Sequence, residues 1–258
     1  MGRVNYNFSG KTVLITGASR GIGYAIAEEF LCAGAKIYVL SSQDEIYIAA
    51  KKLAYLGDVV GLKCDITNSA SVASVIQNIK QIDVLINNAG LERITPIDDL
   101  SNEVEETFRR VIDTNVVGTF LVTRHAVKKM SSGGRIIITG SIWSRTAVAE
   151  FSAYCASKHA NLGFMRSIAH ELGPKGINVN AVCPGWVKTK AALSSLKIMS
   201  ESKGCSERDL LKEITNAQVL NGLLDPKDLA SLYLFLASDG AKDITGQAYM
   251  LDRGEVMG

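Results

Sequence analysis

The chain has no apolar run that approaches the roughly 20 residues a helix needs to cross a bilayer. The stretch from Met1 to Gly10 is polar and lacks the apolar centre of a secretory signal peptide. The net charge is only +2 over 258 residues, and no block of lysine and arginine stands out. These absences predict a soluble, cytoplasmic protein with no membrane partner and no nucleic-acid partner.

Cysteine and histidine are also sparse. The five cysteines are scattered and form no Cys-x-x-Cys pair, which predicts free thiols in a reducing compartment. None of the three histidines has the spacing from a cysteine that a zinc site requires, so no metal site is expected. By contrast, hydrophobic residues make up 47% of the chain and charged residues 21%, which suits a soluble chain with a large core.

A glycine-rich turn lies close to the N-terminus. Residues 11–16 are a short β-type run, residues 17–23 read Gly-Ala-Ser-Arg-Gly-Ile-Gly, and residues 24–33 are amphipathic. In such a strand–turn–helix unit, backbone N–H groups and the helix N-terminus bind a pyrophosphate. The positions must be glycine because a side chain would block the approach of the phosphates. This unit predicts a dinucleotide site.

The end of the second predicted strand bears on which dinucleotide binds. An NAD site normally carries an acidic residue here for the ribose 2′-hydroxyl, whereas this chain has Ser41 and Ser42. Together with Arg20 in the glycine turn, this favours NADP over NAD. Asp44 and Glu45 follow as alternative ribose ligands, but Ser42-x-x-Glu45 also matches a helix capping box, which predicts a structural role for them.

Strand and helix signals alternate along the rest of the chain. We expect strands at residues 11–16, 36–40, 59–63, 82–86, 135–139, 177–182 and 248–251, and helices at 24–33, 69–80, 102–130, 152–172 and from 226 onward. With no repeat or linker, this pattern predicts one α/β domain over residues 1–258, a doubly wound (Rossmann) parallel seven-stranded sheet. Residues 186–222 carry only two short helical signals, which indicates a helical substrate lid.

The chemistry is expected near Tyr154 and Lys158, which share one face of the predicted helix because they are four residues apart. A phenol with a pKa of about 10 is a poor base at neutral pH, and a nearby ammonium favours the phenolate. Ser141 ends the preceding strand and can donate a hydrogen bond to a substrate oxygen. A tyrosine and a lysine at this spacing are also common on an ordinary helix surface.

Taken together, the motifs resemble the short-chain dehydrogenase/reductase family over nearly the whole chain. The matching pieces are Thr-Gly-Ala-Ser-Arg-Gly-Ile-Gly at 16–23, Asn-Asn-Ala-Gly at 87–90, Ser141, Tyr154-x-x-x-Lys158, Ile-Asn-Val-Asn at 177–180 and Pro-Gly at 184–185. The chain departs from its relatives at Arg253, where many have glycine, and at Ser42, where many NADP-specific members have a basic residue.

The resemblance implies a role for each catalytic position. Tyr154 would be the general acid/base, Ser141 would position and polarise the carbonyl, and Lys158 would lower the pKa of Tyr154 and bind the nicotinamide ribose. Asn115 would hold a water that relays protons toward Lys158. The family likeness also implies a homotetramer packed through the helices at 102–130 and 152–172.

Cofactor and substrate contacts follow from the same likeness and from the turns at the strand ends. The expected cofactor contacts are Gly17, Ser19, Arg20, Gly21, Ile22, Gly23, Ser41, Ser42, Asp65 (to the adenine), Ile66, Asn88, Ala89, Gly90, Tyr154, Lys158, Pro184, Gly185, Val187 and Thr189 (to the nicotinamide carboxamide). The candidate substrate contacts are Trp143, Arg145 and Trp186, with Glu92, Arg93 and Phe151 also adjacent to the motifs.

The function expected from these residues is hydride transfer between NADP, or NAD, and the carbonyl or alcohol carbon of a small substrate. One alternative is a non-catalytic nucleotide-binding sensor or scaffold of the same fold. Another is a sugar-nucleotide epimerase or dehydratase, since those relatives share Tyr-x-x-x-Lys. A 3-oxoacyl thioester, a polyol or sugar, and a hydroxy acid all stay open as substrates.

Overall fold

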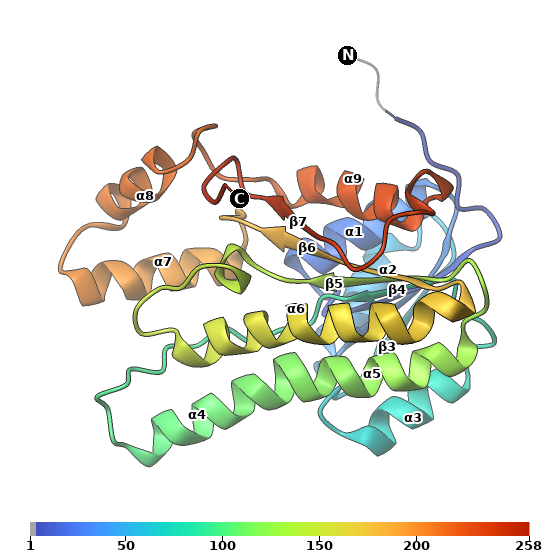
Figure 1. Ribbon diagram of the computed structural model, residues 1–258, viewed down its shortest axis with the longest axis horizontal. Coiled ribbons are helices and arrows are strands. Elements are labelled where there is room, and N and C mark those ends of the chain that lie inside the picture. Colours follow the sequence, from blue (N-terminus) through green and yellow to red (C-terminus); the bar gives the residue numbers. More distant parts are fainter. Residues whose placement is uncertain (1–3, 258) are drawn as a thin grey trace.

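A computed structural model describes residues 4–257, and its centre is a parallel sheet covered by helices on both faces (Figure 1). The strands are β1 Thr12–Thr16, β2 Lys36–Ser41, β3 Val59–Lys63, β4 Val84–Asn87, β5 Arg135–Thr139, β6 Asn178–Pro184 and β7 Ala248–Leu251. The helices are α1 Gly21–Cys32, α2 Glu45–Leu53, α3 Ser69–Gln77, α4 Asn102–Ile112, α5 Gly118–Ala126, α6 Ser152–Leu172, α7 Lys190–Lys203, α8 Glu207–Asn216 and α9 Pro226–Ala237. The predicted doubly wound sheet is confirmed.

The strand order places a crevice at the middle of the sheet. The order is β3-β2-β1-β4-β5-β6-β7, with every neighbouring pair parallel, so the winding reverses between β1 and β4. Thr16 joins the two strand ends there, because its Oγ1 accepts hydrogen bonds from the N–H groups of Asn88 and Ala89, both at 3.0 Å. Ligands of such sheets bind in the crevice at this switch point.

The central strands are apolar on both faces, as parallel strands between two helical layers must be. On β1, Val13 and Ile15 face a core shared with α1, α2 and α9, whereas Leu14 faces a core shared with α3, α5 and α6. In Figure 1 the first group of helices lies above the sheet and the second below it. The buried apolar side chains on both faces anchor the strand ends that form the crevice.

The helix predicted over residues 102–130 is interrupted. A π-helical turn at Asp113–Val117 separates α4 from α5, and a 3-10 turn at Val127–Lys129 ends the run. Asn115 lies within the π-helical turn and is fully buried. The wider π-helical turn lets the side chain of Asn115 leave the helix and form hydrogen bonds with Leu91 and Ser157.

The capping box expected at Ser42 and Glu45 is wrong. α2 begins after Asp44, which makes no side-chain capping bond, and the hydroxyl of Ser42 accepts a hydrogen bond from the side chain of Gln43 at 3.5 Å. The first hydrogen bonds of the helix run from Ile46 to Gln43 and from Tyr47 to Asp44, so Ser42 lies two residues before the N-cap and cannot cap the helix. Its hydroxyl is left at the end of β2.

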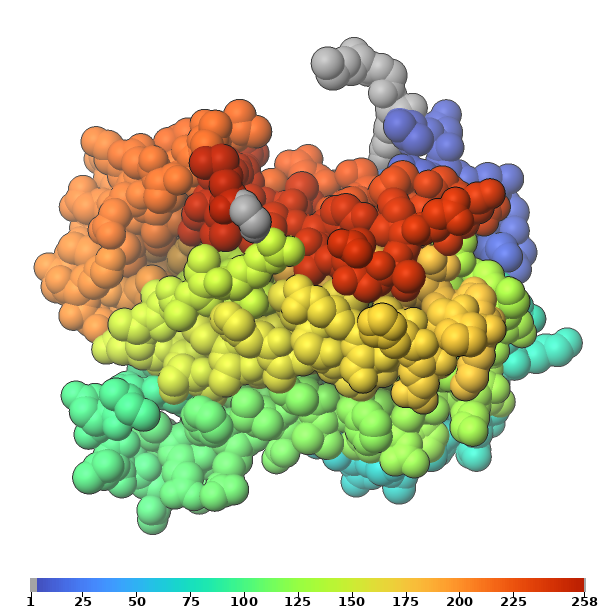
Figure 2. Space-filling model, viewed as in Figure 1, coloured from blue at the N-terminus to red at the C-terminus, as the bar shows by residue number. Residues whose placement is uncertain are grey.

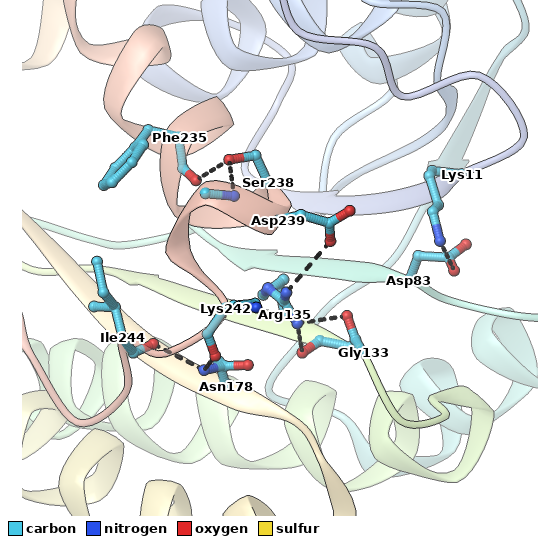
Figure 3. A network of polar contacts seen from close by, with 12 residues as sticks. Lys11, Asp83, Gly133, Arg135, Asn178, Phe235, Ser238, Asp239, Lys242 and Ile244 are labelled. Atoms are coloured by element: carbon cyan, nitrogen blue, oxygen red, sulfur yellow. Dashed lines mark hydrogen bonds and ion pairs between the residues drawn. The ribbon is translucent and has the colours of Figure 1, made fainter.

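A group of polar contacts around Arg135 lies at the amino ends of β5 and β6, away from the crevice (Figure 3). Its buried guanidinium donates to the carbonyls of Gly133 at 2.7 Å and Gly134 at 3.2 Å and lies 3.8 Å from Asp239. On the next strand, the side chain of Asn178 donates to the carbonyls of residues 242 and 244. These bonds fix β5 and β6 to the segment that leads into β7, far from the crevice.

The segment at 186–222 folds as the two predicted helical pieces, α7 and α8, beyond the carboxyl end of the sheet (Figure 1). Ser206 caps α8 as expected, with its hydroxyl accepting from the N–H of Asp209 at 3.1 Å. Leu196, Met199 and Leu210 of these helices join a third apolar cluster with Trp143 and Trp186. Of the helices in residues 4–257, none combines the length and apolarity needed to cross a membrane.

Candidate active site

A cavity of about 950 Å³ lies across the carboxyl ends of the strands. Its walls come from the glycine turn, the end of β2, the loop after β4, the start of α6, the loop after β6 and α7. Of the residues expected to touch a dinucleotide, those that line the cavity are Gly17, Ser19, Arg20, Gly21, Ile22, Ser41, Ser42, Asp65, Ile66, Asn88, Ala89, Gly90, Tyr154, Lys158, Pro184, Gly185, Val187 and Thr189. Gly23 is the exception.

The glycine turn leaves no room for side chains. Gly17 has a φ of +67°, and a Cβ there would lie 2.7 Å from the Cα of Ala89. A Cβ on Gly23 would lie 2.6 Å from the Nδ2 of Asn88. That amide donates to the carbonyls of Thr16 and Gly17, both at 3.1 Å. Gly23 therefore serves the packing of the turn against Asn88, while Gly17 lies at the cavity wall.

The groups at the end of β2 fit a phosphate better than a free ribose. Arg20 and Ser42 line the cavity, whereas Asp44 and Glu45 do not. Asp44 points to the far side and pairs with Lys63 at 3.0 Å. The nearest acidic residues in sequence are thus not ribose ligands in this structure, and the cation of the glycine turn faces the same space as Ser42.

Tyr154 and Ser141 meet at the reacting end of the cavity. Ser141 forms a side-chain hydrogen bond with the phenol of Tyr154. Ser141 is itself held at the start of a short 3-10 turn, where its N–H donates to Ser144 Oγ at 3.0 Å and its Oγ accepts from the N–H of Trp143 at 3.2 Å. The Trp143 ring packs edge-on against Tyr154 with 5.8 Å between centroids. Serine and phenol are therefore fixed relative to each other.

Lys158 lies beneath the Tyr154 ring. Its Nζ is 5.4 Å from the ring centroid and donates to the carbonyl of Thr139 at 2.8 Å. The side chain is buried, and this burial lowers the pKa of Lys158 to about 8. The last residue of β5, Thr139, thus holds the ammonium of Lys158 at the cavity. This partner was not predicted from the sequence.

The pKa of Tyr154 is raised well above its usual value of 10.0, so the expectation that Lys158 lowers it is wrong for this structure. Burial is the main cause, the negative charge of Glu92 adds to it, and the hydrogen bond with Ser141 opposes both. Lys158, whose ammonium bonds to the carbonyl of Thr139, is not among the groups that lower the pKa of Tyr154. At neutral pH Tyr154 is therefore a protonated phenol.

Asn115 fixes the loop after β4. Its Oδ1 accepts from the N–H of Leu91 at 2.7 Å, and its Nδ2 donates to the carbonyl of Leu91 and to Ser157 Oγ, both at 2.9 Å. A Cβ on Gly90 would lie 3.5 Å from Asn115 Oδ1 and 3.6 Å from Lys158 Nζ, so the two side chains flank that glycine. The role of holding a water toward Lys158 stays a prediction.

The candidate substrate residues do not all lie together. Trp143, Phe151 and Trp186 line the cavity as expected, and so do Glu92 and Arg93. Arg145 does not; its guanidinium donates to the carbonyl of residue 248 at 3.2 Å. The sequence analysis missed Ser195 of α7, whose hydroxyl bonds to the carboxylate of Glu92 within this cavity. Only the fold brings α7 over the loop after β4.

The thiols near the site are not activated. Cys155 and Cys183 are buried and free, and burial raises the pKa of each above its ordinary value. Both are therefore thiols at neutral pH and poor nucleophiles. Within residues 4–257, no cluster of three or more histidine, cysteine or acidic side chains is placed to hold a metal ion. Ser141, Tyr154 and Lys158 are the candidate catalytic groups of the cavity.

Known proteins of similar sequence and structure are oxidoreductases. A family model described as enoyl-(acyl carrier protein) reductase matches residues 17–255. The oxidoreductase UcpA of Salmonella typhimurium is 37% identical over 257 residues, covering 96% of this chain and 95% of the relative. The 3-oxoacyl-[acyl-carrier-protein] reductase FabG of Rickettsia bellii is 34% identical over 258 residues, covering 97% and 99%. The structure of L-sorbose reductase from Gluconobacter frateurii, complexed with NADPH and L-sorbose, superimposes with a TM-score of 0.89 at 27% identity, covering 99% and 100%.

Proposed function

The chain belongs to the short-chain dehydrogenase/reductase family of oxidoreductases, and we propose that it transfers a hydride between NADP(H) and the carbonyl or alcohol carbon of a small substrate. The observation that carries the proposal is the grouping of Ser141, Tyr154 and Lys158 at one end of a cavity whose other end is the glycine turn. A hydride donor and a proton donor are needed on the same substrate carbonyl, and this arrangement provides a place for each.

The residues of the cavity fit a dinucleotide with a 2′-phosphate. Gly17 and Gly21 line the cavity without side chains, which leaves the backbone of the turn open to a pyrophosphate. Arg20 and Ser42 offer a guanidinium and a hydroxyl to the 2′-phosphate, and Asp44 is turned away toward Lys63. L-sorbose reductase, which has the same fold, is described in complex with NADPH. These points favour NADP over NAD.

In the proposed mechanism the bound nicotinamide supplies or accepts the hydride, and this chain's residues handle the proton and the charge. Tyr154 gives its phenolic proton to the substrate oxygen in reduction, since its raised pKa keeps it protonated. Ser141 donates to the same oxygen as negative charge develops there. Lys158, held by Thr139, would bind the ribose and bring positive charge under the Tyr154 ring.

The cofactor preference is tested with Arg20→Ala. We expect the KM for NADPH to rise about 10-fold or more, with the KM for NADH nearly unchanged, because a charge-assisted bond to the 2′-phosphate is lost. Steady-state rates with both cofactors give the ratio. Arg93→Ala, which removes a cation from the substrate end of the same cavity, is the matched control. Wild-type preference for NADH would contradict the assignment.

We also propose that residues 186–222 are a lid over the substrate. Two hydrogen bonds attach α7 to the loops beneath it: Ser195 bonds to Glu92, and Ser202 donates to Glu150 at 2.9 Å. Trp186 at the start of the segment packs edge-on against Trp143 with centroids 6.0 Å apart. Leu196, Met199 and Leu210 of the segment pack in the same apolar cluster, which is separate from the two cores of the sheet, so that opening would leave the sheet intact.

A homotetramer is proposed from the family likeness and from one face of the molecule. In Figure 2, α4 and α5 (green) and α6 (yellow) lie side by side on this face. Three apolar side chains of these helices and of the turn between α4 and α5, Phe108, Val117 and Phe120, are 38%, 38% and 44% exposed. We expect sedimentation velocity to give four chains, and Phe120→Glu to give smaller species. Tyr55→Glu, an exposed position after α2, is the control, and a monomeric wild type would contradict the proposal.

The direct test is oxidation of NADPH and NADH over a panel of ketones, sugars and 3-oxoacyl thioesters. Turnover of any carbonyl compound supports the oxidoreductase. Dinucleotide binding with no turnover across the whole panel would instead favour the non-catalytic module. Such a module has no need of a phenol, a serine hydroxyl and a lysine in mutual contact, which is why we favour the enzyme.

A further inference from the structure

Glu92 is the one acidic side chain at the reacting end of the cavity. It follows the Asn-Asn-Ala-Gly turn, and its sequence neighbour Arg93 is exposed, yet the carboxyl group of Glu92 is turned inward and largely stripped of water. The loop is held in this position by two bonds between Asn115 and Leu91 and by a bond from the Arg93 guanidinium to the carbonyl of Glu92 at 2.7 Å. The inward carboxyl group is thus a fixed feature of the site.

The carboxyl group faces the catalytic pair. Glu92 lines the same cavity as Tyr154 and Lys158, and its negative charge raises the pKa of both. Its Oε1 bonds to Ser195 of α7, and within residues 4–257 its Oε2 has no hydrogen-bond partner. A carboxyl group with one oxygen bonded and the other free at the cavity wall favours a ligand that donates a hydrogen bond.

We propose that Glu92 is a specificity-determining residue that accepts a hydrogen bond from a substrate hydroxyl close to the reacting carbonyl, so that the enzyme acts on hydroxy-ketones and polyols. This inference rests on the proposed function and names its substrate class. A 3-oxoacyl thioester offers no hydroxyl at this place and would leave Glu92 Oε2 without a donor, with only Oε1 bonded to Ser195. A hydroxy acid would bring a second carboxylate against the first.

A cationic substrate fits less well than a neutral hydroxyl. The ammonium of Lys158 and the guanidinium of Arg93 already act on Glu92, and a third positive charge would meet both. The aromatic rings of Trp143, Phe151 and Trp186 also line this end of the cavity. Such rings exclude water and can pack against the C–H faces of a polyol. The phenol of Tyr154 as donor, the carboxyl group of Glu92 as acceptor and the aromatic wall together select an uncharged, hydroxylated carbonyl compound.

The test compares 3-hydroxy-2-butanone with 2-butanone, which differ by one hydroxyl beside the carbonyl, and adds an acetoacetyl thioester of N-acetylcysteamine. For the wild type with NADPH we expect kcat/KM to be about 10- to 100-fold higher for the hydroxy-ketone than for 2-butanone. Glu92→Leu is expected to reduce that ratio at least 10-fold. Glu92→Gln, which keeps an acceptor oxygen and the size of the side chain, should give an intermediate ratio.

Ile97→Ala, at a 91% exposed position of the same loop, is the matched control and should leave the ratio unchanged. An unchanged ratio in Glu92→Leu, or a wild type that prefers the thioester, overturns the inference. Quenching of tryptophan fluorescence by 3-hydroxy-2-butanone and by 2-butanone, in the wild type and in Glu92→Leu, measures binding without turnover. Loss of hydroxyl-dependent binding in the variant supports the subsite even where no carbonyl is reduced, whereas absence of all turnover counts against the proposed reaction alone.

Discussion

Tyr154→Phe is expected to lower kcat by about 10³-fold, because the variant has no proton to give to the substrate oxygen. The ring that packs edge-on against Trp143 is kept, and only the hydroxyl that bonds to Ser141 is lost. Dissociation constants for NADPH, measured by fluorescence, should therefore change less than about threefold, since one hydrogen bond outside the glycine turn is removed. The loss appears in turnover and leaves cofactor binding nearly intact.

Tyr47→Phe, at an exposed position of α2, serves as the control for removal of a phenol and should turn over like the wild type. A second comparison uses Ser141→Ala. If serine and phenol act on the same oxygen, the double variant should lose little more than the worse single variant, because residues that act as a unit are not additive. Turnover of Tyr154→Phe within tenfold of the wild type would remove the phenol from the mechanism.

Much of the fold follows from local sequence signals. The strands β1 and β5 have apolar, mainly β-branched centres and β7 is a short apolar run, and the structure confirms their bounds to within one residue. The glycine turn was predicted from its place between a strand and a helix, and the structure adds that Gly17 has a positive φ and lies close to Ala89. Periodicity and glycine spacing act over a few residues, so a single sequence reports them directly.

What the sequence did not reveal depends on contacts between distant segments. The π-helical turn at Asn115 exists because Leu91 and Ser157, 24 and 42 residues away, bond to that side chain. Glu92 was expected near the pocket because it follows the Asn-Asn-Ala-Gly turn, but its bond to Ser195 depends on the placement of α7 above that loop. The pKa of Tyr154 was expected to be low from the spacing of Lys158, whereas burial and Glu92 raise it, and burial is a property of the whole fold.

The buried ammonium that serves the site also destabilises the protein. The pKa of Lys158 is about 8 against an ordinary 10.5, and this difference corresponds to about 3 kcal/mol of unfavourable free energy for the charged form in the folded state. Lys158→Met removes that cost, while the carbonyl of Thr139 loses its donor at a cost of about 1–2 kcal/mol. We expect the variant to lose activity by at least about 10²-fold and yet to be more stable than the wild type at pH 7, by about 1–2 kcal/mol.

The difference in the free energy of unfolding between Lys158→Met and the wild type should fall as the pH rises. Between pH 8 and pH 10.5 the unfolded wild type keeps the Lys158 proton while the folded wild type releases it, so the free energy of unfolding of the wild type rises with pH in that window. Lys158→Met has no such term, and its advantage should shrink by about 3 kcal/mol from pH 7 to pH 10.5 and reverse near the upper end. Urea unfolding of both proteins without added dinucleotide measures the difference, with the exposed Lys52→Met of α2 as control for loss of one positive charge. A difference that stays constant across the window would mean that Lys158 is not buried as an ammonium, and the charge assigned to the site beneath Tyr154 would have to come from elsewhere.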